Sequence, residues 1–431
     1  MTLVEICLRL GDKMKISYGK GFIDVNINKD YDLYQLKIDS APLSGKEILE
    51  RLDNEPIYSE NLTYFIKHAR KILFIVPDIT RKSGLQIFIK DLIEKIETFK
   101  KEFSIIFATG THRKVTDEEK KWILTEEVYN KYKHLLIDHD PDNMDNLVYF
   151  GKTKNGTPIL LNKAYLEHDT IIPIASVSYH YFAGFGGGRK MILPGIAARK
   201  SALNNHKLVL DERNMRKHPL ATTGNLKQNP VNDDIVEAVM IARRGKFFFT
   251  INTILNDKGE IIDLTCGDLF MSHIEATERL KKYTMITANK KYDTIIVSCG
   301  GYPKDINMVQ AQKSLDRVIP IAANNANIIF FAECVDGYGN NYFEEFFDIT
   351  TSEEMFKTLI KDYQINRQTA YSLKIKTENY NVFLYSNFSE SDCKRMGFIK
   401  INSIEEINNI INNANNIAIV PDAYNVFFNT D

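Results

Sequence analysis

The 431-residue sequence lacks several features that would place it in a specialised class. Its net charge is −1 at pH 7, so it has neither the basic surface typical of nucleic-acid-binding proteins nor an acidic tail. Its longest apolar runs, TIIPIA (170–175) and ANIIFFA (326–332), are far too short to cross a bilayer. The N-terminus has no signal-peptide pattern. These absences predict a cytoplasmic globular protein without nucleic-acid or membrane partners.

The sequence also lacks paired cysteines. Its five cysteines are scattered and form no Cys-x-x-Cys motif: Cys7, Cys266, Cys299, Cys334 and Cys393. This spacing supports neither a zinc site nor a disulfide framework, so we expect free, buried thiols.

A glycine run is present, but it fits neither common phosphate-binding motif. The stretch SYHYFAGFGGGRKMILPG (178–195) has four glycines in five residues. A P-loop needs Ser or Thr after its lysine, whereas Met191 follows Lys190. The dinucleotide pattern G-x-G-x-x-G fails because Arg189 stands where the third glycine belongs. A lysine after glycines is typically a phosphate contact, but a desolvated lysine can form a covalent bond, and the spacing leaves both open.

Apolar runs alternate with amphipathic segments, which predicts an α/β fold. Buried strands are expected at 71–78, 103–110, 169–177, 327–334 and 415–422. Amphipathic helices are expected at 85–102 and 269–284. Continuous apolar strands separated by helices are typical of mainly parallel sheets. Because a new strand–loop unit opens near residue 285, we expect an N-terminal α/β domain over 1–274 and a C-terminal α/β domain over 285–431.

Candidate catalytic side chains follow the predicted strands of the first half. Asp78 and Arg81 follow the first strand in PDITR, His112 the second in GTHR, and His180 the third. The loops beyond the carboxyl ends of parallel strands gather at one edge of the sheet. Two neutral histidines there could act as acid and base, and a third, such as His206, could bind a metal. Arg81 could hold a carboxylate or phosphate through two hydrogen bonds.

In the second half, the loop GGYPKDIN precedes a predicted helix. Gln310 and Lys313 are three residues apart and share one face of that helix. Each candidate also has a plainer explanation, because Asp78 could cap a helix and a histidine could make a local hydrogen bond. The loop before the helix favours a helix start facing a cleft, where an arginine from one domain and a lysine from the other would grip a small anion.

Taken together and in this order, the motifs resemble the nickel-pincer lactate racemase family. The motifs are PDITR, GTHR, YHYFAGFGGGRKMILPG, NNH and GGYPKDIN…QAQK, and the resemblance extends over residues 10–425. It implies an isomerase, a racemase or epimerase that inverts the C2 centre of a 2-hydroxy acid. It also implies two α/β domains with the active site in the cleft between them, and leaves room for the last segment to pack back on the N-terminal domain.

The resemblance further implies a nickel-pincer nucleotide, a pyridinium-3,5-bisthiocarboxylic acid mononucleotide that holds nickel. By position, Lys190 would bind this cofactor covalently through a thioamide, and His206 would be the protein's ligand to nickel. Further residues are implied beside the cofactor: Asp78, Gly186, Gly187 and Gly188. Proteins that build the cofactor and insert nickel are implied as transient partners.

The same resemblance implies that His112 and His180 are the acid–base pair, one for each enantiomer. Arg81, Gln310 and Lys313 would hold the substrate carboxylate. One histidine would remove the hydroxyl proton as hydride leaves C2 for the cofactor. The planar 2-keto acid would then take the hydride back on its other face while the second histidine returns a proton.

Two departures from the lactate-using members leave the substrate's side chain open. Those members carry a tyrosine just before the glutamine of the Q-x-x-K pair, where this chain has Val309. They also carry a tryptophan later in the second domain, whereas the single tryptophan here is Trp122 and Tyr371 lies in about that region. Lactate, a larger 2-hydroxy acid and a sugar acid all remain candidates.

Two other functions stay open at this point. A noncatalytic protein of the same fold that binds nucleotides or organic anions would keep Arg81 and Lys313, but need not keep both His112 and His180. A hydrolase with a metal held by His112, His180 and His206 would need a carboxylate at metal-ligand spacing, and the sequence offers none.

Overall fold

A computed structural model of the chain describes residues 4–8, 12–36, 38 and 40–429. The chain forms two compact units that alternate along the sequence. Unit 1 comprises the described residues of Met1–Asp39, Leu210–Lys217 and Lys281–Asp431, and unit 2 comprises Ser40–Val209 and His218–Leu280. Each unit contains a large, mainly parallel sheet with helices, which confirms the predicted α/β class.

The sheet of unit 2 has eight strands in the order β5-β18-β17-β11-β6-β7-β8, with β16 beside β11. Their bounds are β5 (Pro56–Ile57), β6 (Lys71–Pro77), β7 (Glu102–Ala108), β8 (Leu136–Asp138), β11 (Thr170–Ser176), β16 (Phe247–Phe248), β17 (Thr250–Leu255) and β18 (Ile261–Gly267). Because β6 runs parallel to both β7 and β11, the three strands end at the same edge. These are the strands predicted at 71–78, 103–110 and 169–177.

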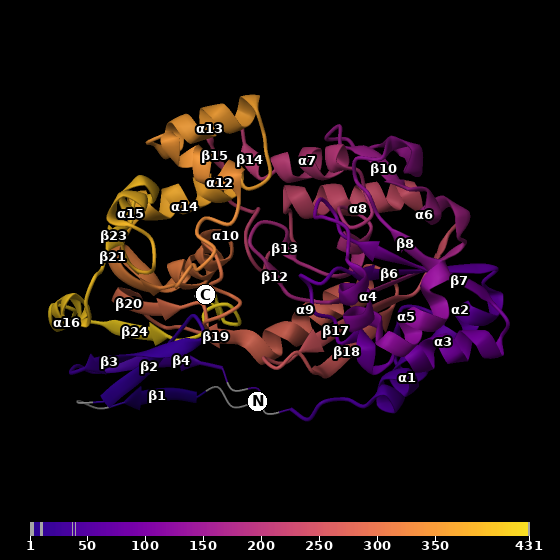
Figure 1. Ribbon diagram of the computed structural model, residues 1–431, viewed down its shortest axis with the longest axis horizontal. Helices are drawn as coiled ribbons and strands as arrows, with labels where there is room; N and C mark the ends of the chain where they lie inside the picture. The colour runs from indigo at the N-terminus through magenta and orange to yellow at the C-terminus, as the bar shows by residue number, and fades with distance from the viewer. Residues whose placement is uncertain (1–3, 9–11, 37, 39, 430–431) are drawn as a thin grey trace. The chain divides into compact units, whose positions relative to one another are not determined.

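Helices cover both faces of this sheet. Those of unit 2 are α1 (Gly45–Asn54), α2 (Leu62–His68), α3 (Ile89–Thr98), α4 (Asp117–Leu124), α5 (Glu126–Tyr132), α6 (Lys163–Glu167), α7 (Arg199–Lys207), α8 (Pro230–Arg243) and most of α9 (Met271–Thr284). Alternate residues of β6, such as Phe74 and Val76, pack with α1–α5 in one core. Figure 1 shows α3 and α8 on opposite sides of β6. The helix predicted over 85–102 is shorter than expected: a 3-10 turn (Leu85–Ile87) precedes α3, and β7 already begins at Glu102.

The sheet of unit 1 has seven strands in the order β1-β4-β24-β20-β21-β22-β23, all parallel to their neighbours except β1. Their bounds are β1 (Val4–Leu8), β4 (Tyr31–Gln35), β20 (Tyr292–Ser298), β21 (Ala322–Phe331), β22 (Asn381–Tyr385), β23 (Ile399–Lys400) and β24 (Ile417–Val420). The helices of this unit are α10 (Met308–Ala311), α11 (Leu315–Val318), α12 (Asn341–Glu345), α13 (Ser352–Lys361), α14 (Arg367–Asn379), α15 (Glu390–Met396) and α16 (Ile404–Asn412).

The first residues of the chain differ from the expected domain boundaries. The sequence assigned 1–274 to one domain, but β4 pairs with β24, and β2 (Asp12–Tyr18) and β3 (Gly21–Ile27) belong to the same unit. In Figure 1 the indigo strand β4 lies beside the yellow strand β24. The last segment also stays in unit 1, because β25 (Phe427–Asn429) pairs with β19 (Met285–Thr287). Its backbone therefore completes a sheet of its own unit.

A short hairpin interrupts unit 2. It consists of β14 (Leu210–Asp211) and β15 (Arg216–Lys217) and belongs to unit 1, although α7 before it and α8 after it belong to unit 2. The expected free thiols are found at Cys266, Cys299, Cys334 and Cys393, all buried, whereas the side chain of Cys7 lies outside the described part. Within the described ranges, no helix has the length and apolar character needed to cross a membrane.

Candidate active site

Three loops of unit 2 meet at the carboxyl edge of its sheet, as the sequence predicted. They follow β6, β7 and β11 and carry most of the predicted site residues. The backbone N–H of Gly110, after β7, donates to the carbonyl of Gly195 over 2.9 Å. The hydroxyl of Ser176, at the end of β11, donates to the carbonyl of Lys82 over 2.5 Å. These bonds fix the loops relative to one another.

The first two loops are joined by Asp78 and His112. Nδ1 of His112 donates to Oδ2 of Asp78 over 2.7 Å, while the backbone N–H and hydroxyl of Thr80 donate to Oδ1 of Asp78 over 3.0 and 2.6 Å. Burial alone would raise the pKa of Asp78, but the bonds from His112 and Thr80 and the charge of Arg81 outweigh burial and lower it. Since a carboxylate only accepts, Nδ1 of His112 carries a proton and Nε2 of the neutral ring keeps its lone pair. Solvent reaches this ring, because 53% of the His112 side chain is exposed.

The third loop holds His180 in the opposite tautomer. His180 ends β12 (Tyr179–His180), which pairs with β13 (Gly184–Phe185). The backbone N–H groups of Ala183 and Phe182 donate to its Nδ1 over 3.2 and 3.5 Å. The proton of the neutral ring therefore sits on Nε2. The two histidines thus differ in which ring nitrogen carries the proton, Nδ1 in His112 and Nε2 in His180.

Lys190 lies in a 3-10 turn (Gly188–Met191) directly after the glycine run. In the described part of the chain, its amine takes part in no hydrogen bond or ion pair, and it lies over the Phe182 ring, 5.8 Å from the centroid. Burial, together with the charges of Arg189 and Arg81, lowers the pKa of Lys190 well below its ordinary value. A lower pKa raises the fraction of the amine that is uncharged, and only the uncharged amine is a nucleophile. Of the two roles that the sequence left open, this environment favours the covalent one.

His206 lies in the last turn of α7. Its two ring nitrogens are buried and, among the described residues, have no hydrogen-bond partner. Burial, with a smaller effect of Lys190, lowers the pKa of His206 to about 3, so the ring is neutral. A buried nitrogen without a partner costs stability. A neutral imidazole with free lone-pair capacity is, however, what a metal ligand requires.

Phe182 connects three of the predicted residues. Its buried ring lies 4.5 Å from the ring of His180 and 5.0 Å from the ring of His206, and the amine of Lys190 lies over it. Its carbonyl accepts a hydrogen bond from Nδ2 of buried Asn229 over 2.8 Å. Sequence reasoning missed Phe182, because an apolar side chain carries no chemical signal. Its only clue is its position between His180 and the glycines.

The glycine run packs closely against the protein itself. Gly187 and Gly188 have φ values of +80° and +51°, which favour glycine. A Cβ on Gly188 would lie 2.6 Å from the ring of His273, and one on Gly187 would lie 3.1 Å from the carbonyl oxygen of Ser176. Nε2 of His273 donates to the carbonyl of Gly186 over 2.8 Å. This packing is sufficient reason for glycine at both positions, and a role beside a cofactor stays a prediction.

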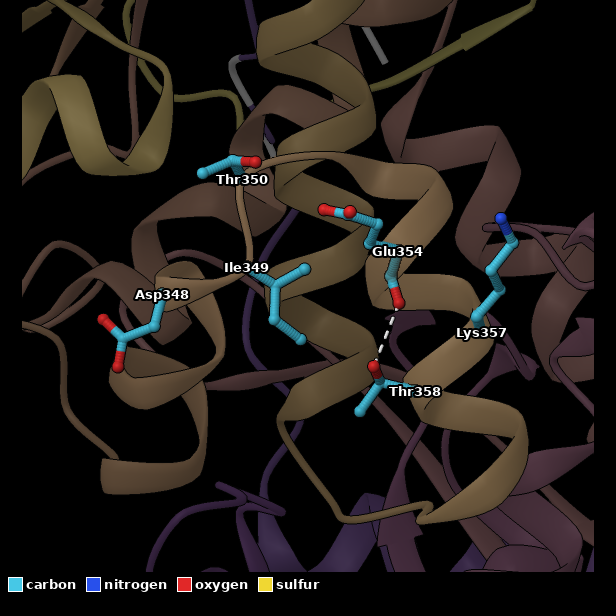
Figure 2. A pocket seen from close by; sticks show the side chains of 6 residues that line it. All are labelled: Asp348, Ile349, Thr350, Glu354, Lys357 and Thr358. Atoms are coloured by element: carbon cyan, nitrogen blue, oxygen red, sulfur yellow. Dashed lines mark hydrogen bonds between the residues drawn. The ribbon is translucent and has the colours of Figure 1, made fainter.

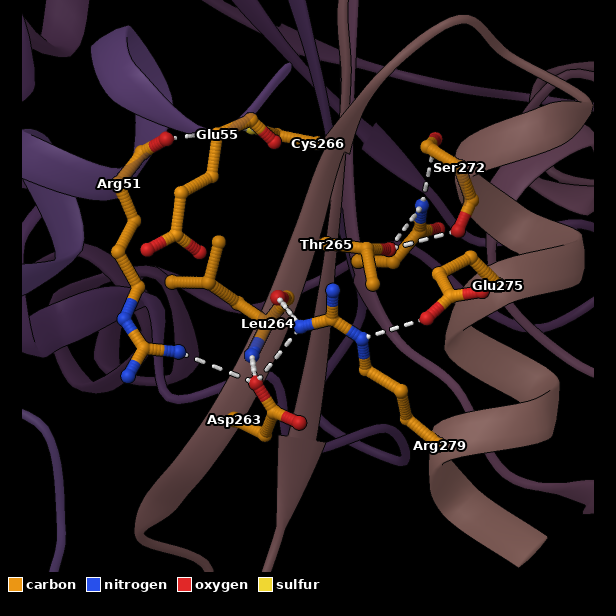
Figure 3. A network of polar contacts seen from close by, with 10 residues as sticks. Arg51, Glu55, Asp263, Leu264, Thr265, Cys266, Ser272, Glu275 and Arg279 are labelled. Carbon is orange, nitrogen blue, oxygen red and sulfur yellow. Dashed lines mark hydrogen bonds and ion pairs between the residues drawn. The ribbon is translucent and has the colours of Figure 1, made fainter. Parts of the chain in front are cut away.

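His273 is a second residue that sequence reasoning missed, and Arg189 holds its ring in place. Nη1 of buried Arg189 donates to Nδ1 of His273 over 3.0 Å, and Nε of Arg189 donates to Oδ1 of Asn232 over 2.7 Å. The hydroxyl of Thr265 in β18 donates to the carbonyl of neighbouring Ser272 over 2.6 Å, as Figure 3 shows. The rest of that network ties β18 to α1 and α9 through Arg51, Asp263, Glu275 and Arg279.

Unit 1 carries the other predicted pair. Nζ of Lys313 donates to Oε1 of Gln310 over 2.7 Å, so the two side chains do share one side. They do not share one regular helix, because α10 ends at Ala311 and a 3-10 turn (Gln312–Ser314) follows. Asn307 caps α10 by accepting from the N–H of Gln310 over 3.1 Å.

Across the residues that the structure describes, no group of three or more His, Cys, Asp and Glu side chains could hold a metal ion. His112, His180 and His206 therefore do not form the cluster that a metal hydrolase would need.

Two of the hollows on the described surface differ in how they relate to the site. One lies beside α13 in unit 1, and Figure 2 shows the side chains that line it, none of which is a predicted site residue: Asp348, Ile349, Thr350, Glu354, Lys357 and Thr358. The other lies in unit 2 and is lined by His112 with Arg113, Lys114 and Arg199, among others. Only the second hollow reaches a predicted catalytic side chain.

Two family descriptions match the chain. Residues 18–217 match the lactate racemase N-terminal domain, and residues 287–428 match the lactate racemase C-terminal domain. The chain is 28% identical over 433 residues to a lactate racemase of Thermoanaerobacterium thermosaccharolyticum, covering 96% of this chain and 98% of that one. It is 30% identical over 329 residues to a lactate racemase of Lactiplantibacillus plantarum, covering 74% and 75% respectively.

Solved structures agree with these matches. The lactate racemase apoprotein from T. thermosaccharolyticum superposes with a TM-score of 0.83 at 26% identity, covering 97% of this chain and 100% of that chain. A Thermotoga maritima protein superposes with a TM-score of 0.67 at 17% identity, covering 92% and 100%, and shows the shared fold.

Proposed function

The chain belongs to the lactate racemase family, and on that premise we propose that it is a racemase or epimerase that inverts the C2 centre of lactate or a related 2-hydroxy acid. One observation carries the proposal: the amine of Lys190 and the ring of His206 both lie against Phe182, and neither has a hydrogen-bond partner among the described residues. In that state neither group gains stabilisation from a hydrogen bond. Each is suited to a bond with a molecule that the protein binds.

These residues fit a nickel-pincer nucleotide. Lys190 would hold it covalently, and His206 would be the protein's ligand to nickel. When bound, this group supplies a hydride acceptor for the substrate's C2. The neutral state of His206 supports its assignment, because only an unprotonated imidazole nitrogen can bind a metal. Further residues are proposed beside the cofactor: Asp78, Gly186, Gly187 and Gly188.

We propose His112 and His180 as the acid–base pair. Asp78 orients His112 so that its Nε2 can accept the hydroxyl proton of one enantiomer. Once protonated, His112 keeps its bond to Asp78, and the carboxylate stabilises the imidazolium. His180 differs, because it can take a second proton only by giving up the two N–H groups that point at its Nδ1. Taking up a proton therefore costs His180 two hydrogen bonds but leaves the bond of His112 to Asp78 in place.

Arg81, Gln310 and Lys313 are proposed to hold the substrate carboxylate. The guanidinium of exposed Arg81 makes no hydrogen bond or ion pair within the described ranges, so an anion can take both of its donor positions. Lys313 and Gln310 offer a charge and an amide on one side of their turn. The side chain of the acid stays open. A cytoplasmic location and transient contact with cofactor-building and nickel-inserting proteins are further parts of this proposal, and they rest on the family and on composition.

The test is a panel of enantiopure 2-hydroxy acids. The protein is co-expressed with the cofactor-building enzymes in nickel-containing medium, and inversion of each acid is followed by chiral chromatography. We expect inversion of at least one acid, bound nickel, and an added mass on the peptide that contains Lys190. In K190R the added mass and the inversion should both be lost, whereas K200R, in the first turn of α7, should keep both.

The same experiment can also show that the proposal is wrong. If the co-expressed protein has neither nickel nor an added mass and inverts no acid in the panel, the proposal is wrong. A noncatalytic anion-binding protein would then be favoured if H112Q and H180Q bind the same acids as tightly as the unaltered chain.

A further inference from the structure

Lys376 occupies an unusual place in unit 1. It lies in α14, and its ammonium group pairs with Oδ1 of Asp316 over 2.8 Å and donates to Oε1 of Gln312 over 3.0 Å. Only 7% of the Lys376 side chain and 12% of the Asp316 side chain are exposed. Ser372, one turn earlier in α14, lies 3.4 Å from the same ammonium. The charge pair is therefore shielded from water on nearly all sides.

The two partners of Lys376 lie at either end of one turn. Gln312 begins the 3-10 turn that separates α10 from α11, and Asp316 lies in the first turn of α11. A 3-10 turn inside a helical segment has poorer hydrogen-bond geometry than an α-helix and is a weak point in it. Because one ammonium contacts both ends, Lys376 links Gln312 to Asp316 across this turn. Lys313 lies inside this turn, and Gln310 just before it.

The cluster is poorly suited to stability alone. Gln312 Nε2 and Asp316 Oδ2 are buried and, in the part of the chain described, have no hydrogen-bond partner. Burying an ion pair costs desolvation that its attraction does not always recover, and apolar residues of similar volume are often as stable. A costly polar cluster of this kind is expected where a neighbouring group has to be held in one orientation.

We propose that Lys376 is a positioning residue for the substrate, which acts by holding the Gln312–Ser314 turn so that Lys313 and Gln310 form one carboxylate-binding pair. The inference rests on the proposed function, in which those two residues bind the carboxylate. Lys376 itself does not touch the substrate. Its loss should weaken binding of the acid and leave the chemical step nearly unchanged.

The kinetic test compares four variants of the nickel-loaded enzyme. In K376M, KM for the 2-hydroxy acid should rise roughly tenfold, the loss expected when a charged hydrogen bond is misplaced, with kcat within about threefold of the unaltered enzyme. K376R should have a KM between those of K376M and the unaltered enzyme, because it keeps the charge. K376M/D316L removes both charges, so it should be more stable than K376M but keep the raised KM. K374M makes the same charge change on the same helix and should leave KM unchanged.

Hydrogen exchange of the apoprotein gives a second readout that needs no cofactor. Amides of residues 308–318 should exchange faster in K376M and K376M/D316L than in K374M. If K376M/D316L has the KM of the unaltered enzyme, or if exchange over 308–318 is unchanged in K376M, the inference is wrong. If no acid is inverted by the unaltered enzyme, the proposed function fails, and exchange still decides whether Lys376 holds the turn.

Discussion

Nδ1 of His112 donates to Oδ2 of Asp78 over 2.7 Å, and Oδ1 of the same carboxylate accepts twice from Thr80. This arrangement predicts the effect of D78N. The two donors of Thr80 would keep the amide oxygen of Asn on their side, so its NH2 group would face His112. Nδ1 would then have to accept, and the lone pair at Nε2 would be lost. We expect kcat to fall by about a thousandfold or more, as when a catalytic histidine is held in the wrong tautomer.

The measurement for D78N is the inversion rate by chiral chromatography, with the tautomer of His112 read by ¹⁵N NMR. The control is T80V, which removes the hydroxyl donor but keeps the carboxylate, and it should cost less than about tenfold. A D78N enzyme with unchanged kcat, or with Nδ1 of His112 still protonated, would contradict the role of Asp78.

We predict that replacing His206 makes the apoprotein more stable. Because both of its ring nitrogens are buried without a partner among the described residues, H206L should raise the free energy of unfolding of the apoprotein by roughly 1–3 kcal/mol while abolishing nickel binding. Urea unfolding followed by fluorescence of Trp122, the single tryptophan, measures this. H139L is the matched control: Nε2 of buried His139 donates to the carbonyl of Ala197 over 3.0 Å and its Nδ1 accepts from Nδ2 of Asn162 over 3.5 Å, so loss of this ring should destabilise. A less stable H206L would show that the ring is satisfied in the apoprotein.

We predict that His139 causes part of the loss of stability of unit 2 at low pH. Burial lowers its pKa to about 4 in the folded chain, only partly opposed by its bond to the carbonyl of Ala197. In the unfolded chain a histidine titrates at about 6.5, so between these values the unfolded chain binds the extra proton. Stability is therefore full above about pH 6.5 and falls as the pH drops toward about 4, by up to about 1.4 kcal/mol per pH unit.

H139Q tests this pH dependence. Glutamine can still donate to Ala197 but does not titrate, so the slope of unfolding free energy between about pH 6.5 and 5 should become shallower. Urea titrations across this range measure the slope in both proteins. Equal slopes would mean that His139 is not the group that protonates on unfolding.

We predict that adding a side chain at Gly188 causes a large loss of stability. In G188A the methyl group would meet the ring of His273 at 2.6 Å while the backbone stays at a φ of +51°. We expect a cost of about 2–4 kcal/mol, from overpacking and from the left-handed backbone together. In G245A, φ is +77° but nothing lies within 4 Å of the added Cβ, so only the backbone cost of about 1 kcal/mol applies. Thermal unfolding of the two variants should separate these contributions, and equal losses would contradict the packing role of His273.

Features that depend on local pattern could be predicted from the sequence. The strands β6, β7 and β11 are continuous apolar runs, and loops after parallel strands must share an edge, so the amino-acid pattern alone is enough to place Asp78, His112 and His180 in loops at the same edge of the sheet. Lys190 and His206 are assigned by resemblance, and their lack of partners among the described residues adds a physical reason for those roles.

The features that could not be predicted depend on distant contacts. Nothing in residues 31–35 shows that their partner is a strand near the end of the chain, because this pairing is decided by segments at opposite ends of the sequence. His273 lies in an ordinary helical pattern, and its role becomes visible only through the space that Gly188 leaves. The contact of Lys376 with Gln312 joins residues 64 positions apart, and no local pattern near Gln310 reveals it.

The pairing of β4 with β24 has a consequence for how the chain is made. A ribosome delivers β4 before any of unit 2, but β24, the strand beside which it lies, is synthesised after the whole of unit 2. The continuous stretch 40–280 contains all of unit 2, so that unit can fold during synthesis. During that time the edge of β4 that pairs with β24 lacks its native partner. A chain that stalls before residue 417 would therefore expose this edge.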